Sequence, residues 1–216
     1  MSLLLHSYWR ATAPYRVRIG LNLKGLAYDY ASVDLLAGEQ RQAGYRAINP
    51  QGLTPALIAD GQVLTQSVAI LEWLEETHPE PALLPRQASD RAVVRAMAAV
   101  VACDVHPLNN ARVARKLGQL GLDAAAIADW STGWIGDGFD ALEPMIAAHG
   151  QGFAFGDRPT IADCVLVPQV YAAVTRFDMD MGRWPALAGA YAAALKLPAV
   201  QAAHPDRQPD AGSAHA

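Results

Sequence analysis

The sequence predicts an α/β domain followed by an all-helical domain, and two observations indicate this fold class. Up to about Leu84, short strand-like runs alternate with helical patterns in the order β-α-β and then β-β-α, which is typical of an α/β layer. After a proline-rich stretch at residues 78–85, apolar residues recur only at helical spacing. We therefore expect an α/β domain at residues 1–84 and a helical domain at residues 85–216.

Four strands are expected in the first domain, because short runs of aliphatic and aromatic residues are bounded there by turn or helix signals. These runs occupy residues 3–7, 28–35, 53–58 and 62–64. The dipeptide Asp60-Gly61 between the last two runs predicts a tight hairpin turn. Apolar residues at helical spacing predict helices at residues 13–24 and from Ser67 through Leu74.

The second domain begins after the stretch 78–85, which holds three prolines in eight residues and so predicts a linker. Helical patterns beyond it occupy residues 93–101, 123–148, 160–177 and 186–197. Thr160 and Asp163 have the spacing of a capping box, which satisfies backbone N–H groups at a helix start, so we assign them to folding. Residues from His204 onward are expected to run loosely over the surface.

Composition narrows the possible functions. Seventeen Lys and Arg against twenty-one Asp and Glu give a net charge of −4, which argues against a nucleic-acid partner. No apolar run approaches the roughly 20 residues that span a bilayer, and the N-terminus lacks the features of a secretory signal, so we expect a soluble, cytoplasmic protein with no membrane partner. Cys103 and Cys164 have no CxxC spacing, so neither a metal site nor a disulfide framework is expected.

The dipeptide Thr54-Pro55 is unusual because it places a proline at the start of a predicted central strand. A cis peptide bond would explain it, and the residue before the proline would then turn its N–H and C=O outward. Such a pair can bind an extended peptide through strand-like hydrogen bonds. For an isolated motif, however, an ordinary trans proline is the commoner case.

Two other polar segments lie at predicted helix starts. Gln66 and Ser67 open an otherwise apolar helix, whose free N–H groups and dipole attract a carboxylate. Ser67 also suits a helix N-cap, so both roles stay open. Thr12 follows the first strand, where open α/β sheets bind ligands. Its hydroxyl either caps the first helix or points toward a ligand, and spacing alone favours the cap.

Taken together, these motifs resemble the glutathione transferase superfamily, and specifically its zeta class, over essentially the whole chain. The segments that carry the resemblance include residues 8–19, 49–52, 54–57, 66–70, 104–110, 156–163 and 205–210. The resemblance implies a thioredoxin-like N-terminal domain followed by an all-α C-terminal domain, the glutathione transferase fold. It also implies glutathione as cofactor and a homodimer.

Glutathione contacts follow from the resemblance, residue by residue. Thr54 before a cis Pro55 would hydrogen-bond the cysteinyl backbone of glutathione. Gln66 and Ser67 would hold its γ-glutamyl carboxylate, and Gln51 would contact its glycyl end. Asp104 would reach the γ-glutamyl amine across the dimer interface.

One position departs from the family pattern. The thiol-activating segment of the family usually carries a serine directly after the arginine, whereas Ala11 follows Arg10 here. Thr12 is then the only hydroxyl before Pro14. Hydrogen bonds to a thiolate favour it and lower the thiol pKa toward neutral pH. Thr12, or the backbone amide of Ala13, is therefore the candidate donor to the sulfur.

The second substrate would bind through arginines, since zeta isomerases act on small dicarboxylate keto-acids and guanidinium groups pair well with carboxylates. Arg10 and Arg176 are the candidates. His106 and Asn110 are expected to line the same cavity, although capping or packing is an equally good role for His106.

The implied activity is a glutathione-dependent cis-trans isomerisation of maleylacetoacetate or maleylpyruvate in the catabolism of aromatic compounds. One alternative is a general glutathione transferase that conjugates or dehalogenates small electrophiles. Another is a binding protein of the same fold without catalysis, for which Ala11 is the motivating feature.

Overall fold

A computed structural model describes residues 2–212 of the chain, in two compact units. One unit contains the residues up to Leu83 together with the segment from Leu195 onward, and the other is Leu84–Ala194. The prediction had assigned residues 195–212 to the helical domain. The structure instead packs this segment on the first unit, because its apolar and polar side chains find their partners there, as described below.

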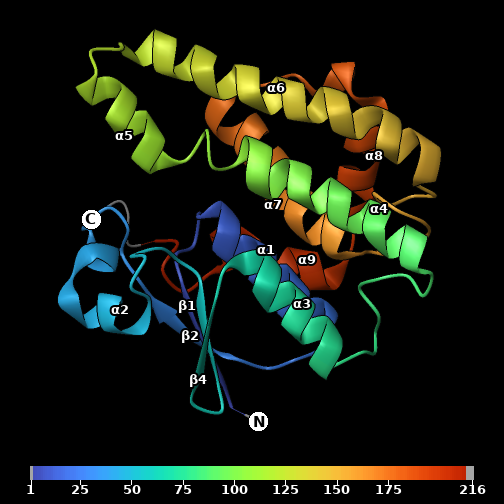
Figure 1. Cartoon of the computed structure of the whole chain (residues 1–216), viewed down its shortest axis with the longest axis horizontal. Coiled ribbons are helices and arrows are strands. Elements are labelled where there is room, and N and C mark those ends of the chain that lie inside the picture. Colours follow the sequence, from blue (N-terminus) through green and yellow to red (C-terminus); the bar gives the residue numbers. More distant parts are fainter. Residues whose placement is uncertain (1, 213–216) are drawn as a thin grey trace. The chain divides into compact units, whose positions relative to one another are not determined.

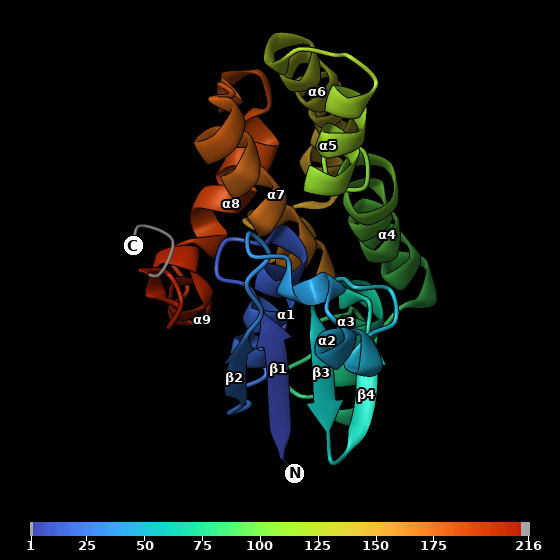
Figure 2. The same ribbon diagram turned by 90° about the vertical axis from the view of Figure 1, so that its left-hand side faces the viewer.

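The first unit is built on a four-stranded mixed sheet, whose strand order β2-β1-β3-β4 is visible in Figure 2. The strands are β1 (Leu3–Ser7), β2 (Asp29–Ser32), β3 (Ala56–Ala59) and β4 (Gln62–Thr65). Strand β1 pairs parallel with β2 and antiparallel with β3, which pairs antiparallel with β4. Asp60 and Gly61 both have positive φ, at 46° and 88°, as the predicted tight turn between β3 and β4 requires.

Helices cover both faces of this sheet (Figure 2). Helices α1 (Thr12–Leu23) and α3 (Ser67–Thr77) pack together on the face where the alternate residues of β1 are buried. The two helices approach closely because of Gly20, where a Cβ atom would lie 2.3 Å from Cδ2 of Leu71. On the other face, His6 of β1 meets Tyr45 of α2 (Ala43–Ile48), with their ring centroids 5.8 Å apart.

The C-terminal segment is an integral part of the first unit. Helix α9 (Pro198–Ala203) packs on α1, and Asn22 Nδ2 donates to the carbonyl of Ala199 at 3.0 Å. After a short 3-10 turn, η4 (Pro205–Arg207), the side chains of Gln208 and Asp210 are buried. The expectation of a loose tail is therefore wrong for the described residues, because their polar side chains satisfy hydrogen bonds within the unit.

The second unit is all-helical, as predicted. It contains α4 (Ala88–Ala99), the π-helical η2 (Val100–Val105), α5 (Ala111–Gln119), α6 (Ala124–His149), α7 (Ile161–Phe177), η3 (Met181–Arg183) and α8 (Pro185–Ala194). Helix α7 is the core of the unit and contacts α4, α6 and α8 (Figure 1). Among the described residues, no helix is long and apolar enough to cross a membrane.

The capping box predicted at the start of α7 is present. Thr160 Oγ1 accepts from the backbone N–H of Ala162 at 3.2 Å, and Asp163 Oδ2 accepts from the N–H of Thr160 at 2.8 Å. The second carboxylate oxygen of Asp163 accepts from the N–H of Ala154 at 2.8 Å. Asp163 therefore joins the preceding loop to the helix start, which confirms its assignment to folding.

The buried Asp163 predicts a pH dependence of stability. Burial raises its pKa to about 6, although the hydrogen bonds from Ala154 and Thr160 lower it. Because the folded state then holds the proton more tightly than the unfolded chain, this contribution to stability is fully present below about pH 4 and is lost as the pH rises through about 6. Urea unfolding of the parent and Asp163→Asn across this range should show the pH-dependent loss only in the parent. Parallel profiles would contradict the expectation.

Candidate functional site

The strand register brings the predicted polar segments of the first unit to one edge of the sheet. His6 of β1 lies opposite Ala56, and Ala56 lies opposite Thr65 of β4. Pro55 directly precedes Ala56, and Gln66 directly follows Thr65. The loop after β1, the start of β3 and the start of α3 therefore adjoin one another.

Thr54 presents an open peptide edge. The Thr54-Pro55 bond is cis, as predicted. Within the described chain, the backbone N–H and C=O of Thr54 make no hydrogen bond. The preceding carbonyl of Leu53 is fixed by Tyr45 Oη and Asn49 Nδ2, each at 2.7 Å. The site thus offers one free donor and one free acceptor on a segment that its neighbours hold in place, as binding of an extended peptide requires.

The start of α3 combines a helix N-terminus with a buried arginine. Gln66 occupies the N-cap position without a side-chain cap bond, and Ser67 is the first helical residue. The hydroxyl of Ser67 accepts from Nη1 of Arg16 at 3.3 Å, and both side chains are buried. The N-cap role left open for Ser67 is therefore wrong. A guanidinium group adds its positive charge to the positive end of the helix dipole, and both favour a carboxylate.

Gln51 and Gln66 meet at the surface beside this helix start. Gln66 Nε2 donates to Gln51 Oε1 at 2.8 Å, so two predicted contacts from different loops are neighbours in space. Both side chains are exposed and available to a ligand.

The start of α1 also leaves its donors open. Ala11 is the N-cap, with no side-chain cap bond, and Thr12 is the first helical residue. Thr12 is buried, and its hydroxyl makes no hydrogen bond within the described residues, nor do the backbone N–H groups of Thr12 and Ala13. The expectation that Thr12 caps the helix is therefore wrong. Arg10 is exposed, with its guanidinium carbon 5.6 Å from the ring centroid of Trp9.

The remaining predicted residues belong to the second unit. Asp104 is exposed in the π-helical segment η2, a type of distortion that is frequent at functional sites. His106 follows as the C-cap of that segment. Asn110 is the N-cap of α5, where Oδ1 accepts from the N–H of Arg112 at 3.0 Å. Arg176 is exposed in the last turn of α7.

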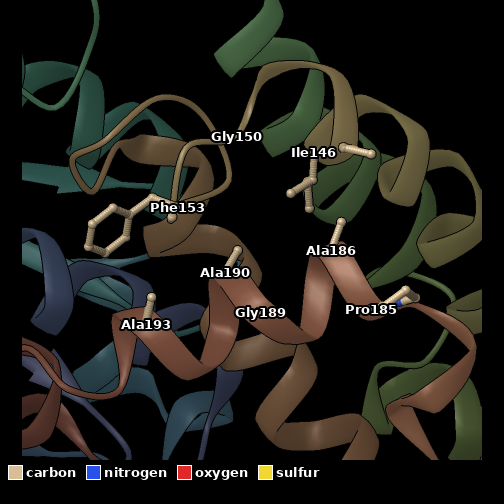
Figure 3. Close-up of a pocket in the computed structure, with 10 residues that line it drawn as sticks. Ile146, Gly150, Phe153, Pro185, Ala186, Gly189, Ala190 and Ala193 are labelled. Carbon is tan, nitrogen blue, oxygen red and sulfur yellow. The ribbon is translucent and has the colours of Figure 1, made fainter.

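A shallow apolar cavity of about 400 Å³ lies within the second unit, between the end of α6 and one face of α8 (Figure 3). Ile146, Phe153, Ala186 and Ala190 are among its lining residues. None of the predicted site residues lines it. Among the described residues, no group of three or more His, Cys, Asp or Glu side chains is placed to hold a metal ion.

Sequence reasoning missed the buried charged residues that support the first-unit site. Arg16 and Arg18 lie in a helix whose other positions are largely apolar, and Asp210 lies in the segment expected to be loose. Charged residues within the apolar run of α1 are the one signal that would have identified the two arginines. Asp210 carries no comparable local signal.

Comparison with known proteins agrees with this architecture. Residues 13–77 match the glutathione S-transferase N-terminal domain, and residues 113–193 match the glutathione S-transferase C-terminal domain. The chain therefore belongs to the glutathione S-transferase family.

Within the family, the relatives point to the zeta class. A maleylpyruvate isomerase of Ralstonia sp. is 47% identical over 95% of this chain and 98% of its own length. A holo structure of a maleylpyruvate isomerase, described as a bacterial zeta-class enzyme, superposes with a TM-score of 0.94 at 47% identity and covers 97% of this chain and 100% of its own. A maleylacetoacetate isomerase of Anaeromyxobacter dehalogenans, with glutathione in its active site, gives 0.88 at 48% identity over 97% and 98%.

Proposed function

We propose that this protein is a glutathione-dependent cis-trans isomerase of maleylacetoacetate or maleylpyruvate. The observation that carries the proposal is the sheet edge of the first unit. There the open peptide group of Thr54 and the start of α3, where Arg16 donates to Ser67, adjoin the loop that leads from β1 to the unfilled donors of α1, which supports a site for an anionic peptide. Relatives named for this reaction cover nearly the whole chain.

The residues of this edge fit glutathione group by group. The N–H and C=O of Thr54 suit the cysteinyl backbone of a tripeptide, since neither is hydrogen-bonded within the described residues and an extended peptide binds through such a pair. Ser67 and the α3 N-terminus, with Arg16 beneath them, suit the γ-glutamyl carboxylate. Gln66 assists there, and Gln51 is placed for the glycyl end.

The start of α1 supplies the chemistry at sulfur. When bound, glutathione provides the nucleophilic thiolate for reversible addition to the cis double bond of the substrate. The hydroxyl of Thr12 and the N–H of Ala13 donate to that sulfur, and the helix dipole favours its negative charge. The family carries a serine at the position of Ala11, and Thr12 takes over the role of that serine here.

Two arginines are proposed to bind the keto-acid substrate. We assign the substrate carboxylates to Arg10 and Arg176, both exposed, because a guanidinium group binds a carboxylate bidentately. His106 is assigned to the same substrate, whereas Asn110 is engaged as the cap of α5. We further propose a cytoplasmic homodimer in which the exposed Asp104 contacts the γ-glutamyl amine held by the partner subunit.

Isomerisation at catalytic glutathione tests the proposed function. Maleylacetoacetate or maleylpyruvate should convert completely to its trans isomer with glutathione far below the substrate concentration, and free thiol should remain constant. Loss of thiol in step with product would indicate a conjugating transferase instead. Binding of glutathione without turnover of either keto-acid would indicate the noncatalytic alternative.

Changing Ser67 to alanine should weaken glutathione binding. The carboxylate would lose one donor, and a hydrogen bond to a charged group is worth roughly 1.5–3 kcal/mol. Isothermal titration calorimetry of the parent, Ser67→Ala and the exposed control Ser89→Ala measures the effect. Unchanged affinity in Ser67→Ala would show that the hydroxyl serves Arg16 alone.

A further inference from the structure

The loop that carries the thiol-activating donors is held from both sides by buried charges. On one side, Arg18 is fully buried, and its Nη2 donates to the carbonyl of Trp9 at 2.7 Å. On the other side, Oδ2 of Asp210 accepts from the backbone N–H of Trp9 at 3.1 Å. Trp9, two positions before Ala11, therefore has both its backbone N–H and its carbonyl fixed by buried side chains.

Arg18 is itself held firmly. Its Nε donates to the carbonyl of Ala203 at 3.0 Å, and its Nη1 donates to the Ser7 hydroxyl at 3.0 Å. Burial lowers the pKa of Arg18, and the tyrosines around it and Asp210 counteract this effect. The guanidinium group thus links β1, the loop and helix α9 within one unit.

Asp210 belongs to the C-terminal segment and is 7% exposed. Besides the Trp9 N–H, its carboxylate accepts from Tyr30 Oη at 2.7 Å and from the Ser32 hydroxyl at 3.0 Å, both on β2. The segment that precedes it is anchored by Gln208, whose Nε2 donates to the carbonyls of Ala202 and His204. The carboxylate is therefore fixed with respect to the sheet and reaches the loop from a rigid base.

Asp210 acts on the loop through its hydrogen bond from the Trp9 N–H, so its influence on the donors of α1 is indirect. The peptide of Trp9 leads through Arg10 to the N-cap Ala11, whose N–H donates back to the carbonyl of Tyr8 at 3.1 Å. The orientation of this turn sets where the first donors of α1 point. A displacement of about 1 Å in a catalytic constellation suffices to change a rate substantially.

We propose that Asp210 is a positioning residue, which orients the Trp9–Thr12 loop through the Trp9 amide so that the donors of Thr12 and Ala13 face the glutathione sulfur. The proposal rests on the proposed function and assigns the C-terminal segment a part in the chemistry. Asp210 holds the amide side of Trp9 and Arg18 holds the carbonyl side. Loss of either would let the peptide rotate.

The test measures the thiol pKa of bound glutathione, by thiolate absorbance, in the parent and in Asp210→Asn. The asparagine keeps the shape but removes the charge and turns one acceptor into a donor. We expect the thiol pKa to rise by about 0.5 to 1, which lowers the thiolate fraction at neutral pH ~3- to 10-fold. The isomerase rate should fall at neutral pH and recover at higher pH. Affinity for S-methylglutathione, which has no ionisable thiol, should stay unchanged.

A matched control separates loop positioning from anchoring of the tail. The double variant Tyr30→Phe, Ser32→Ala removes the two β2 partners of Asp210 but leaves its bond to Trp9. We expect a smaller rise in thiol pKa than in Asp210→Asn, because the bond to Trp9 persists although the carboxylate is held less firmly. Amide hydrogen exchange at Trp9 should accelerate more in Asp210→Asn than in the double variant. If Asp210→Asn does not fold, Asp210→Glu carries the test, with a smaller rise in thiol pKa expected.

Two results would overturn the proposal. One is a thiol pKa in the folded Asp210 variant equal to that of the parent. The other is an equal rise in the Tyr30→Phe, Ser32→Ala variant, which would show that Asp210 only secures the C-terminal segment. Failure of the proposed function would give a different result from either of these. The parent protein itself would then bind no glutathione, or the bound glutathione thiol would keep the pKa of free glutathione.

Discussion

Replacing Thr12 with valine should raise the pKa of the bound glutathione thiol by about one to two and slow isomerisation at neutral pH by about 10- to 100-fold. Valine keeps the shape of the side chain but removes the hydroxyl, and a lost hydrogen bond to a charged group is worth roughly 1.5–3 kcal/mol. Ala11 has no hydroxyl to replace it. Thiolate absorbance titration and the pH dependence of the rate measure the effect.

Stability should not change much in this variant, because the Thr12 hydroxyl forms no cap bond in the structure. Thr12→Ser is the matched control, since it keeps the hydroxyl and should stay near the parent in both measurements. If Thr12→Val folds normally and matches the parent in thiol pKa and in rate, then the N–H of Ala13 is the donor that activates the sulfur.

Replacing Lys24 with methionine should lower the free energy of unfolding by about 3–5 kcal/mol, because it removes one partner of a buried ion pair. Lys24 Nζ lies 2.7 Å from Glu75 Oε2 and also donates to the carbonyl of Pro81 at 2.7 Å. The same carboxylate oxygen accepts from the N–H of Leu83 at 2.8 Å. The pair therefore joins α1, α3 and the proline-rich segment that leaves the first unit.

Denaturant unfolding of three variants isolates this effect. Lys24→Met combined with Glu75→Gln should recover part of the loss, since the buried carboxylate is no longer charged. Lys196→Met, at an exposed lysine, should change stability by no more than about 0.5 kcal/mol. A loss in Lys24→Met as small as that in Lys196→Met would contradict a stabilising role for the pair.

The regular elements of the sheet were accessible from sequence because their signals are local. The run 3–7 matches β1, and Asp60-Gly61 forms the turn expected between β3 and β4. Helix α2 was missed, since it has only six residues and only Tyr45 among them is buried, so no helical apolar pattern arises.

The candidate site could be predicted from sequence only where its signals are local. Thr54-Pro55 and Gln66-Ser67 are dipeptides whose chemistry can be recognised from two adjacent residues. The partners that orient them are distant in the chain, as Arg16 is from Ser67. Burial of a charged side chain depends on which residues pack around it, and the spacing of residues along the chain does not predict these neighbours.

By itself, the sequence determined the four strands and the longer helices, though not α2, α5 or α9, and the polar segments that meet at the sheet edge, because propensity, turn chemistry and periodicity act over a few residues. Tertiary structure decided that neither the Thr12 nor the Ser67 hydroxyl caps its helix. Thr12 and Ser67 became first helical residues rather than caps. It also placed Asp210 against Trp9. Such contacts join residues far apart in the chain, so their free energy exists only once the unit is packed.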